Sequence, residues 1–323
     1  MIARRIAAAV LLLMLGGNAQ AADVYPTRPI RVIAPFPPGG TLDVVIRPPA
    51  EQLSQQLGQP LVIENRSGAN GIIGTDLAAK AAPDGYTLLM VTGSFAINPS
   101  VYRKLPYDVL RDFAPIANLA RGIGYVVVVN PSVPARSLQE LIALDHMPGS
   151  DLTFGSPGIG NPIHLACEML NQRAGTHLRH IPYKGAGPMI TALIAGEVQL
   201  TVMPPIAVLE HIRAGSLRAL AFTGPKRWAE LPDVPIMAEA GVPDYVYEGT
   251  WVGMLAPRGT PRAIVERLNA EVAKALAVPR IAAAITRGGY VLDGGSPEAF
   301  AEFLKDQVAR YAELVRATGI QPE

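Results

Sequence analysis

Short apolar runs alternate with longer segments in which apolar residues recur every three or four positions. The short runs are typical of buried strands, and the longer segments of helices that bury one face. The predicted strands are Ile30 to Ala34, Leu61 to Glu64, Tyr86 to Val91, Phe113 to Asn118, Tyr125 to Asn130, Leu152 to Gly155, Arg179 to Tyr183, Val198 to Met203, Leu217 to Thr223 and Thr250 to Ala256. The clearest predicted helices are Thr41 to Leu57, Ile72 to Ala81, Asn98 to Tyr102, Ile206 to Ala214, Pro261 to Ala277 and Pro297 to Ala317. This order predicts an α/β fold with mainly parallel sheets and helices on both faces.

The junction between the first strand and the first helix is rich in Pro and Gly. Its prolines fix φ, Gly39 and Gly40 permit unusual backbone angles, and Thr41 is expected to cap the helix. A helix N-terminus behind glycines presents unpaired N–H groups and a partial positive charge, so it can hold an anion without a charged side chain. The same stretch is also typical of an ordinary strand-to-helix connection.

A second junction of this kind is the segment from Ser156 to Asn161, where Asn161 is expected to cap a helix that has Pro162 in its first position. Thr92 to Ser94 form a small polar loop at a third junction. Ligands of α/β sheets bind outside the carboxyl ends of the strands. If the two sheets face each other, the first two junctions share one cleft that holds a small carboxylate with main-chain donors.

The N-terminal segment and the composition are typical of an exported protein. Arg4 and Arg5, the apolar run from Ile6 to Leu15, and Ala19-Gln20-Ala21 match a secretory leader. We therefore expect residues 1–21 to be a cleaved signal peptide and the mature protein to act in the periplasm. An uncleaved amphipathic anchor is the alternative. The 323 residues, of which 49% are hydrophobic and 17% charged, suffice for two domains after cleavage.

Charge and reactive residues exclude several classes of function. The net charge of +1 falls to −1 when Arg4 and Arg5 are removed, and no basic block is present, which disfavours nucleic-acid binding. Cys167 is the single cysteine and is expected to be a small core residue. The spacing of His177 and His180 does not fit a metal site. No nucleophile, zinc or nucleotide motif is present, so we expect no cofactor, no metal and no enzyme activity.

A series of short motifs runs in order through the predicted mature chain. It comprises Tyr25 to Asp43 (YPTRPIRVIAPFPPGGTLD), Val62 to Arg66, Gly68 to Gly71, Ala81 to Thr87, Phe154 to Gly158, His164-Leu165, Pro182 to Gly185, Leu231 to Pro235, Glu239 to Gly241 and Ala256 to Pro261. The series resembles the Bug-type receptors, which are the extracytoplasmic solute-binding proteins of tripartite tricarboxylate transporters. The resemblance covers essentially the whole mature chain.

The resemblance implies a two-domain, type II periplasmic-binding-protein fold with a hinge and a ligand cleft. Two crossings are expected, near Gly124 and near Tyr247 to Trp251, which divide the chain into domain I (22–124 plus 250–323) and domain II (125–249). The implied function is that of a monomeric receptor that closes on a small carboxylate and delivers it to membrane permease subunits. A sensor receptor that presents the carboxylate to a signalling partner is the alternative, and an exported hydrolase with a dispersed site is another.

The resemblance also implies which residues bind the ligand. The candidates come from four segments: Phe36, Pro38, Gly39, Gly40, Thr41 and Asp43; Thr92 and Ser94; Ser156, Gly158, Gly160 and Asn161; and Met203. Asp43 has a second interpretation, because an acidic residue in the first turn of a helix compensates the helix dipole, and we favour this structural role. His164 is four residues before Glu168, which suggests a surface ion pair in place of a ligand contact.

Three positions depart from the family pattern. Pro48-Pro49 stand inside the first helix, where a proline costs about 3 kcal/mol, and predict a break with a restart near Pro49. Met203-Pro204-Pro205 stand where many members carry an acidic residue, so we expect a ligand without an ammonium group. Asn161-Pro162 replace the commoner Thr or Ser followed by a polar residue, which changes the polar rim of the site.

Overall fold

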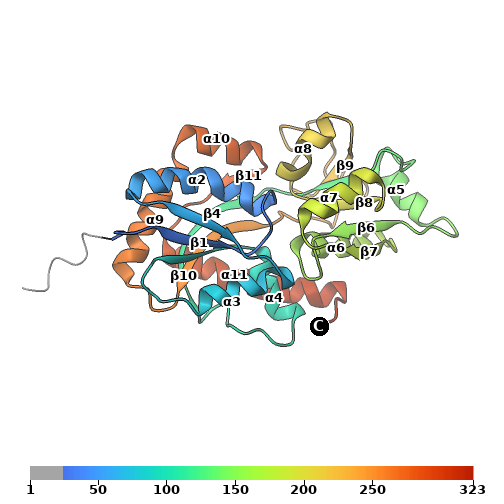
Figure 1. Cartoon of the computed structure of the whole chain (residues 1–323). Helices are drawn as coiled ribbons and strands as arrows, with labels where there is room; N and C mark the ends of the chain where they lie inside the picture. The colour runs from blue at the N-terminus through green and yellow to red at the C-terminus, as the bar shows by residue number, and fades with distance from the viewer. Residues whose placement is uncertain (1–24, 323) are drawn as a thin grey trace, which may run out of the picture.

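A computed structural model describes residues 25–322, apart from the side chains of Thr41 and Val44, so the predicted leader lies outside the described residues. Two β-sheets, each flanked by helices, form the two lobes seen in Figure 1. The predicted two-domain α/β fold is therefore confirmed. Among the described residues, no helix is both long and apolar enough to cross a membrane.

The first lobe is built on a six-stranded sheet in the order β11-β4-β10-β3-β1-β2. Its strands are β1 (Ile30–Ala34), β2 (Leu61–Asn65), β3 (Thr87–Thr92), β4 (Phe113–Gly122), β10 (Trp251–Pro257) and β11 (Tyr290–Leu292). Strand β1 pairs in parallel with β2 and β3, whereas β10 is antiparallel to β3 and β4, and β11 is antiparallel to β4. The sheet is thus mixed and not mainly parallel as predicted, because the strands from the C-terminal part of the chain run against the others.

The second lobe contains a five-stranded sheet in the order β7-β6-β8-β5-β9. Its strands are β5 (Val126–Val129), β6 (Thr153–Ser156), β7 (Arg179–Pro182), β8 (Leu200–Met203) and β9 (Arg218–Phe222). Strands β7, β6 and β8 are parallel, and β5 is antiparallel to both β8 and β9. Every strand of this sheet comes from residues 126–222, which lie between the two stretches that build the first sheet.

Helices cover both faces of the first sheet. Apolar residues of α2 and α9 pack on one face, and those of α3, α4 and α11 pack on the other (Figure 1). The helices are α2 (Thr41–Leu57), α3 (Ile72–Ala79), α4 (Gly93–Val101), α5 (Leu138–Asp145), α6 (Pro162–Ala174), α7 (Ala186–Ala195), α8 (Pro205–Arg213), α9 (Arg262–Leu276), α10 (Pro279–Arg287) and α11 (Pro297–Thr318), with a short 3₁₀ turn η2 (Ala69–Gly71). Helix α11 extends to the second lobe, where Gln172 of α6 donates to the carbonyl of Ala317.

The predicted break in the first helix is wrong. Helix α2 continues through Pro48 and Pro49 from Thr41 to Leu57, and Gly58 ends it in the left-handed conformation. Proline removes main-chain hydrogen bonds but not the burial of the side chains around it. Val45 and Leu53, on either side of the prolines, are 0% and 1% exposed. Tertiary packing of this face therefore holds the helix together across the prolines.

Two local predictions at the helix beginnings are also corrected. Helix α2 begins at Thr41 itself, so the N-cap is Gly40, which has no side chain to cap with. The expected polar loop at Thr92 to Ser94 does not form, because β3 continues to Thr92 and α4 begins at once with Gly93. The hydroxyl of Thr250, which lies 157 residues further along the chain, accepts the N–H of Gly93 at 2.8 Å. This long-range bond stabilises a helix start whose local sequence favours a loop.

Candidate functional site

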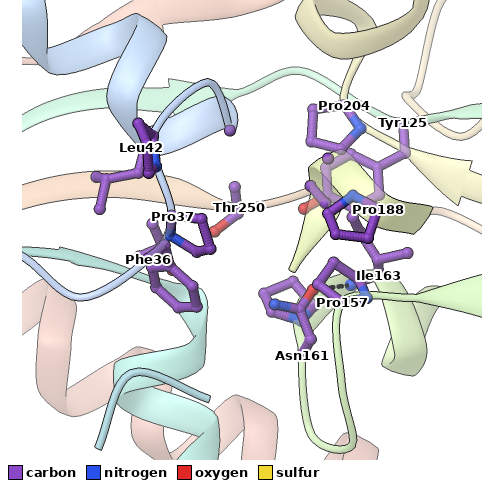
Figure 2. A pocket seen from close by; sticks show the side chains of 16 residues that line it. Phe36, Pro37, Leu42, Tyr125, Pro157, Asn161, Ile163, Pro188, Pro204 and Thr250 are labelled. Carbon is purple, nitrogen blue, oxygen red and sulfur yellow. Dashed lines mark hydrogen bonds between the residues drawn. The ribbon is translucent and has the colours of Figure 1, made fainter. Parts of the chain in front are cut away.

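A cavity of about 110 Å³ lies between the two lobes, which is room for several water molecules. Figure 2 shows the first-lobe residues Phe36, Pro37 and Leu42 facing Pro157, Asn161 and Pro188 of the second. The lining residues are Phe36, Pro37, Pro38, Gly40, Leu42, Thr92, Tyr125, Pro157, Asn161, Pro162, Ile163, Ala186, Gly187, Pro188, Pro204 and Thr250. The predicted shared cleft is therefore present as a cavity that both lobes line.

Five helices begin at this cavity. The lining includes first-turn residues of α2, α6 and α7 and the N-cap residues of α4 and α8, which are Thr92 and Pro204. Helices α2, α4, α7 and α8 have no side-chain cap. Each helix N-terminus adds a partial positive charge. At α4 and α8 the first N–H groups are already bonded, Gly93 to the hydroxyl of Thr250 and Ile206 to the carbonyl of Gly288, so these two helices contribute through their dipoles. The sequence suggested two such helix starts and a third junction; the folded chain brings together five.

Asp43 organises the first loop from behind. Its carboxylate, which is 6% exposed, accepts the N–H of Gly39 at 3.1 Å and two hydrogen bonds from Arg47 at 2.7 and 2.8 Å. Burial raises the pKa of this carboxyl, but the hydrogen bonds from Arg47 and Gly39 outweigh it and lower the pKa overall. Gly39 adopts φ +78°, which suits glycine. Asp43 is thus bonded within the first loop and α2, and it occupies the Gly39 donor.

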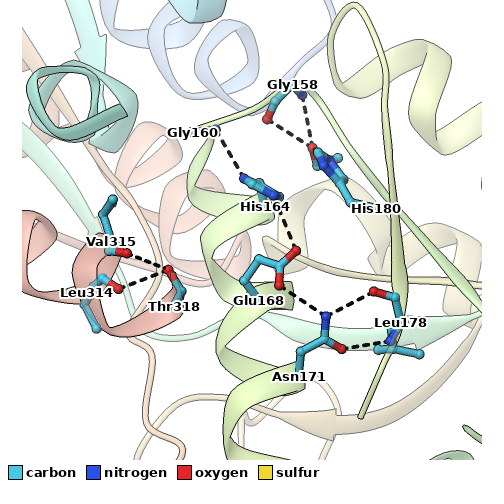
Figure 3. A network of polar contacts seen from close by, with 11 residues as sticks. Gly158, Gly160, His164, Glu168, Asn171, Leu178, His180, Leu314, Val315 and Thr318 are labelled. Atoms are coloured by element: carbon cyan, nitrogen blue, oxygen red, sulfur yellow. Dashed lines mark hydrogen bonds and ion pairs between the residues drawn. The ribbon is translucent and has the colours of Figure 1, made fainter. Parts of the chain in front are cut away.

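A partly buried polar network supports the second loop. Ser156 accepts the N–H of Gly158 at 3.2 Å and contacts His180 Nε2 at 2.6 Å. The N–H of Gly160 donates to Nδ1 of His164 at 3.2 Å (Figure 3). Asn161 caps α6 as predicted, because its side-chain oxygen accepts the N–H of Ile163 at 3.0 Å. These bonds fix the loop from which Pro157 and Asn161 reach the cavity.

The wall of the cavity is mostly apolar and uncharged. Six of the described lining residues are prolines, and none of the described lining residues carries a charged side chain. The polar side chains are those of Thr92, Asn161, Thr250 and Tyr125. Burial, followed by neighbouring tyrosines, raises the pKa of Tyr125 well above its ordinary value, so its hydroxyl stays protonated. A bound anion would therefore meet helix dipoles and neutral donors, and its carbon skeleton would meet proline and aromatic surfaces.

The predicted site residues fall into two groups. Phe36, Pro38, Gly40, Thr92 and Asn161 line the cavity. Gly39, Asp43, Ser94, Ser156, Gly158, Gly160 and Met203 are not among the described lining residues. Thr41 is the first residue of α2, and its side chain is outside the description.

The second group supports the wall from behind. Ser94 is 1% exposed and accepts a hydrogen bond from Asn161 at 3.4 Å. Met203 is fully buried in the core at the end of β8, and the next residue, Pro204, reaches the cavity in its place. The side chain of His164 is also buried, at 5% exposed, so its pair with Glu168 is not the surface pair that the sequence suggested.

Sequence reasoning missed three parts of the wall. The beginning of α7, Ala186 to Pro188, follows the Gly185 loop after β7 and carries the same strand-glycine-helix signal as the two predicted junctions. Tyr125 and Thr250 come from the two segments that connect the lobes. Their place at the cavity depends on how these segments pair, since Gly122 N–H donates to the carbonyl of Thr250 at 2.7 Å. No local pattern encodes that pairing.

The remaining candidates for a reactive site among the described residues are possible metal ligands and the thiol of Cys167. Within residues 25–322, no group of three or more His, Cys, Asp and Glu is placed to hold a metal ion. Cys167 is fully buried, and this burial raises the pKa of its thiol far above the ordinary value. It is therefore the core residue that the sequence predicted.

Comparisons with known proteins agree with this geometry. Residues 45–320 match the family described as "Tripartite tricarboxylate transporter family receptor". The chain is 40% identical to BugT of Bordetella pertussis over 300 residues, which is 92% of this chain and 91% of BugT. It is similar to an R. palustris protein solved with adipate, with a TM-score of 0.88, 36% identity and coverage of 93% and 100% of the two chains. It is also similar to MatC from Rhodopseudomonas palustris with bound malate, with a TM-score of 0.83, 30% identity and coverage of 90% and 100%.

Proposed function

The chain belongs to the tripartite tricarboxylate transporter receptor family, and from this premise we propose that it is a periplasmic receptor whose cleft binds a small carboxylate. One observation carries the proposal: five helix beginnings converge on a cavity whose described lining has no charged side chain. Partial charges from helix termini and unpaired N–H groups suit an anion. The adipate and malate bound to two structural neighbours are anions of this kind.

The proposed binding mode uses donors from both lobes. Gly40 and Leu42 at the start of α2 line the cavity together with Asn161 and Ile163 at the start of α6. Figure 2 shows Leu42 across the cavity from Asn161 and Ile163. A carboxylate between them accepts hydrogen bonds from the start of α2 and from the side-chain amide of Asn161, directly or through water. Helix α6 adds only its partial positive charge, because Pro162 has no N–H and the N–H of Ile163 is bonded to Asn161. This requires no arginine or lysine, so the anion is held by groups whose directions the fold fixes before the ligand arrives.

We propose that domain I comprises residues 22–124 and 250–323 and domain II residues 125–249. The two connecting segments pack so closely that Gly249 has no room for a side chain. A Cβ added there would lie 2.6 Å from Cε1 of Tyr125. The lobes also touch near the cavity, where a Cβ added at Gly185 would meet Pro37 at 3.0 Å. A ligand that contacts both lobes favours the closed arrangement by its differential affinity for the two states.

Family membership supports the last part of the proposal, which is delivery of the ligand to membrane permease subunits. The receptor is secreted with cleavage of residues 1–21, closes on its carboxylate, and is recognised in the closed form. This requires binding without turnover, which separates the receptor from a hydrolase.

The test is a thermal-shift screen of the mature chain against malate, adipate, succinate and benzoate, each paired with its uncharged amide. A ligand at about 100 times its Kd adds ~2.7 kcal/mol to the free energy of unfolding. We expect at least one acid to raise Tm while its amide does not. Calorimetry then gives the stoichiometry, and NMR of the recovered ligand shows whether it is unchanged. Stabilisation by the amides as well as the acids, or consumption of the acid, would overturn the proposal.

A further inference from the structure

A partly buried histidine network lies under the second loop and consists of His164, Glu168 and His180. None of the three is among the described residues that line the cavity. The imidazole rings of His164 and His180 stack with their centroids 4.0 Å apart, and Phe154 stacks on His180 at 4.9 Å. Glu168 lies one helical turn after His164 in α6, with 3.5 Å between Oε1 and Nε2. Two titratable rings and a carboxylate are thus packed together directly behind a binding loop.

The network holds the loop at both of its glycines. Gly160 donates its N–H to Nδ1 of His164, and Gly158 donates its N–H to Ser156, which in turn contacts His180. Figure 3 shows the two histidines side by side, with the loop glycines on one side and Glu168 on the other. Gly160 has φ +69°, and a Cβ added there would lie 2.4 Å from Val101 of the opposite lobe. A small displacement of this loop would therefore change both the cavity wall and the contact between lobes.

The hydrogen bonds fix which nitrogen of His164 carries the proton. Because Gly160 N–H is a donor, Nδ1 of His164 must be an unprotonated acceptor. Nε2 then carries the hydrogen and faces the carboxylate of Glu168. Protonation of His164 would place a second N–H against that of Gly160 and break this bond. The loop geometry thus requires the neutral imidazole.

From this geometry we propose that His164, Glu168 and His180 are positioning residues for the cleft, and that a proton taken up by His164 releases the second loop and weakens ligand binding. The proposal rests on the proposed function only in treating this loop as part of the binding site. It adds a proton sensitivity that the backbone donors of the cavity do not have by themselves.

The surroundings of His164 allow this response. The titratable groups that face it are Glu168 on its own helix and His180 on β7. Strand β8 and helix α4, which also pack on α6, carry no titratable side chain in their sequences. Tyr311 of α11 lies near Pro162, at the beginning of α6, and burial raises its pKa to about 12, so it stays neutral. Tyr245 and Tyr247 donate hydrogen bonds to carbonyls of α6, and burial raises the pKa of both well above the ordinary value, so they stay neutral as well. Burial, followed by His164, lowers the pKa of His180 to about 4, so His180 stays neutral above that pH.

The first experiment uses the ligand-free protein, so that its result does not depend on the identity of the ligand. NMR would follow the amide of Gly160 and the imidazole of His164 between pH 8 and pH 5. We expect the Gly160 amide to lose its hydrogen-bonded shift with the same midpoint as the His164 titration. In Glu168→Gln the midpoint moves to lower pH, because the carboxylate that favours the protonated ring is gone. A Gly160 amide that does not change while His164 titrates would overturn the proposal.

The second experiment separates positioning from packing. His164→Gln keeps an acceptor for Gly160 but does not titrate, whereas His164→Leu removes the acceptor. We expect the Gly160 amide of His164→Gln to be independent of pH. We also compare the Kd of the wild type with that of His164→Gln for adipate or malate. The ratio of the wild-type Kd to the variant Kd should rise about 3- to 10-fold from pH 8 to pH 5. The titration of the ligand affects both proteins equally and cancels in this ratio. The exposed His177, changed to Gln, is the matched control and leaves the wild-type pH dependence intact.

The outcomes distinguish the two proposals. If neither acid binds but the Gly160 amide follows His164, the choice of ligand is wrong and the positioning role stands. If an acid binds and His164→Gln has the same pH dependence as the wild type, the receptor function stands and the positioning role is refuted. Thermal unfolding of each variant identifies any that fail to fold, and Glu168→Gln then supplies the remaining test.

Discussion

The side-chain amide of Asn161 donates to the hydroxyl of Ser94 at 3.4 Å, and this bond joins the first turn of α4 in one lobe to the N-cap of α6 in the other. Asn161 uses its other side-chain atom, Oδ1, to accept the N–H of Ile163. One residue therefore caps a helix, contacts the opposite lobe and lines the cavity. This explains how helix starts from two lobes can present their donors to the same small volume.

The variant Asn161→Asp tests whether the cavity binds an anion. Aspartate is as good an N-cap as asparagine, so α6 should keep its stability. The new carboxylate would stand in the cavity wall and repel a carboxylate ligand, and we expect affinity to fall by at least tenfold in calorimetry. Ser137→Asp is the matched control, since Ser137 caps α5 and is not among the lining residues. Equal affinities in Asn161→Asp and the wild type would exclude this end of the cavity from the site.

The variant Gly40→Leu tests the first loop. Gly40 has φ −79°, which other residues adopt easily, and an added Cβ would meet only the carbonyl of Pro37 at an ordinary 3.6 Å. A leucine there should fold normally and fill part of the cavity, so we expect unchanged Tm and binding reduced tenfold or more. Gly187→Leu, on the opposite wall with nothing within 4 Å of its Cβ, should behave in the same way. Full affinity in either variant would contradict the assignment of that wall.

The histidine network also predicts a pH dependence of stability. His180 has its pKa lowered to about 4, whereas an unfolded histidine has its ordinary value near 6.5. Between these values the unfolded state binds more protons, so the free energy of unfolding falls as the pH drops from 6.5 to 4. The loss is on the order of 1–2 kcal/mol once partial solvent exposure is allowed for. Urea unfolding at several pH values measures this change. The free energy of unfolding of His180→Gln should fall less between pH 6.5 and pH 4 than that of the wild type, and that of His177→Gln should fall as much as the wild type.

The sequence located the two main loops because their signals are local. Prolines and glycines after an apolar run predict a strand-loop-helix junction, and the folded chain has junctions at both places. The sequence did not locate Tyr125 and Thr250, because these residues reach the cavity through the pairing of segments far apart in the chain. It misjudged Pro48-Pro49 for the same reason: local propensity predicts a break, and packing of Val45 and Leu53 in the core outweighs it.

The uncharged wall of the cavity predicts that the ligand has no ammonium group. An ammonium group needs acceptors or a carboxylate partner, and the described lining has no acidic residue, since Pro204 stands in the stretch where the family pattern has an acidic side chain. We therefore expect glutarate to bind more tightly than glutamate, which differs only by the ammonium group.

Pro204 is the N-cap of α8 and lines the cavity. Aspartate is a favourable N-cap, so Pro204→Asp should fold and should also supply the missing partner. Calorimetry should then show a reversed preference, with glutamate gaining affinity and glutarate losing it. A wild-type protein that binds the two acids equally, or a variant that gains nothing for glutamate, would mean that the ligand does not reach this wall of the cavity.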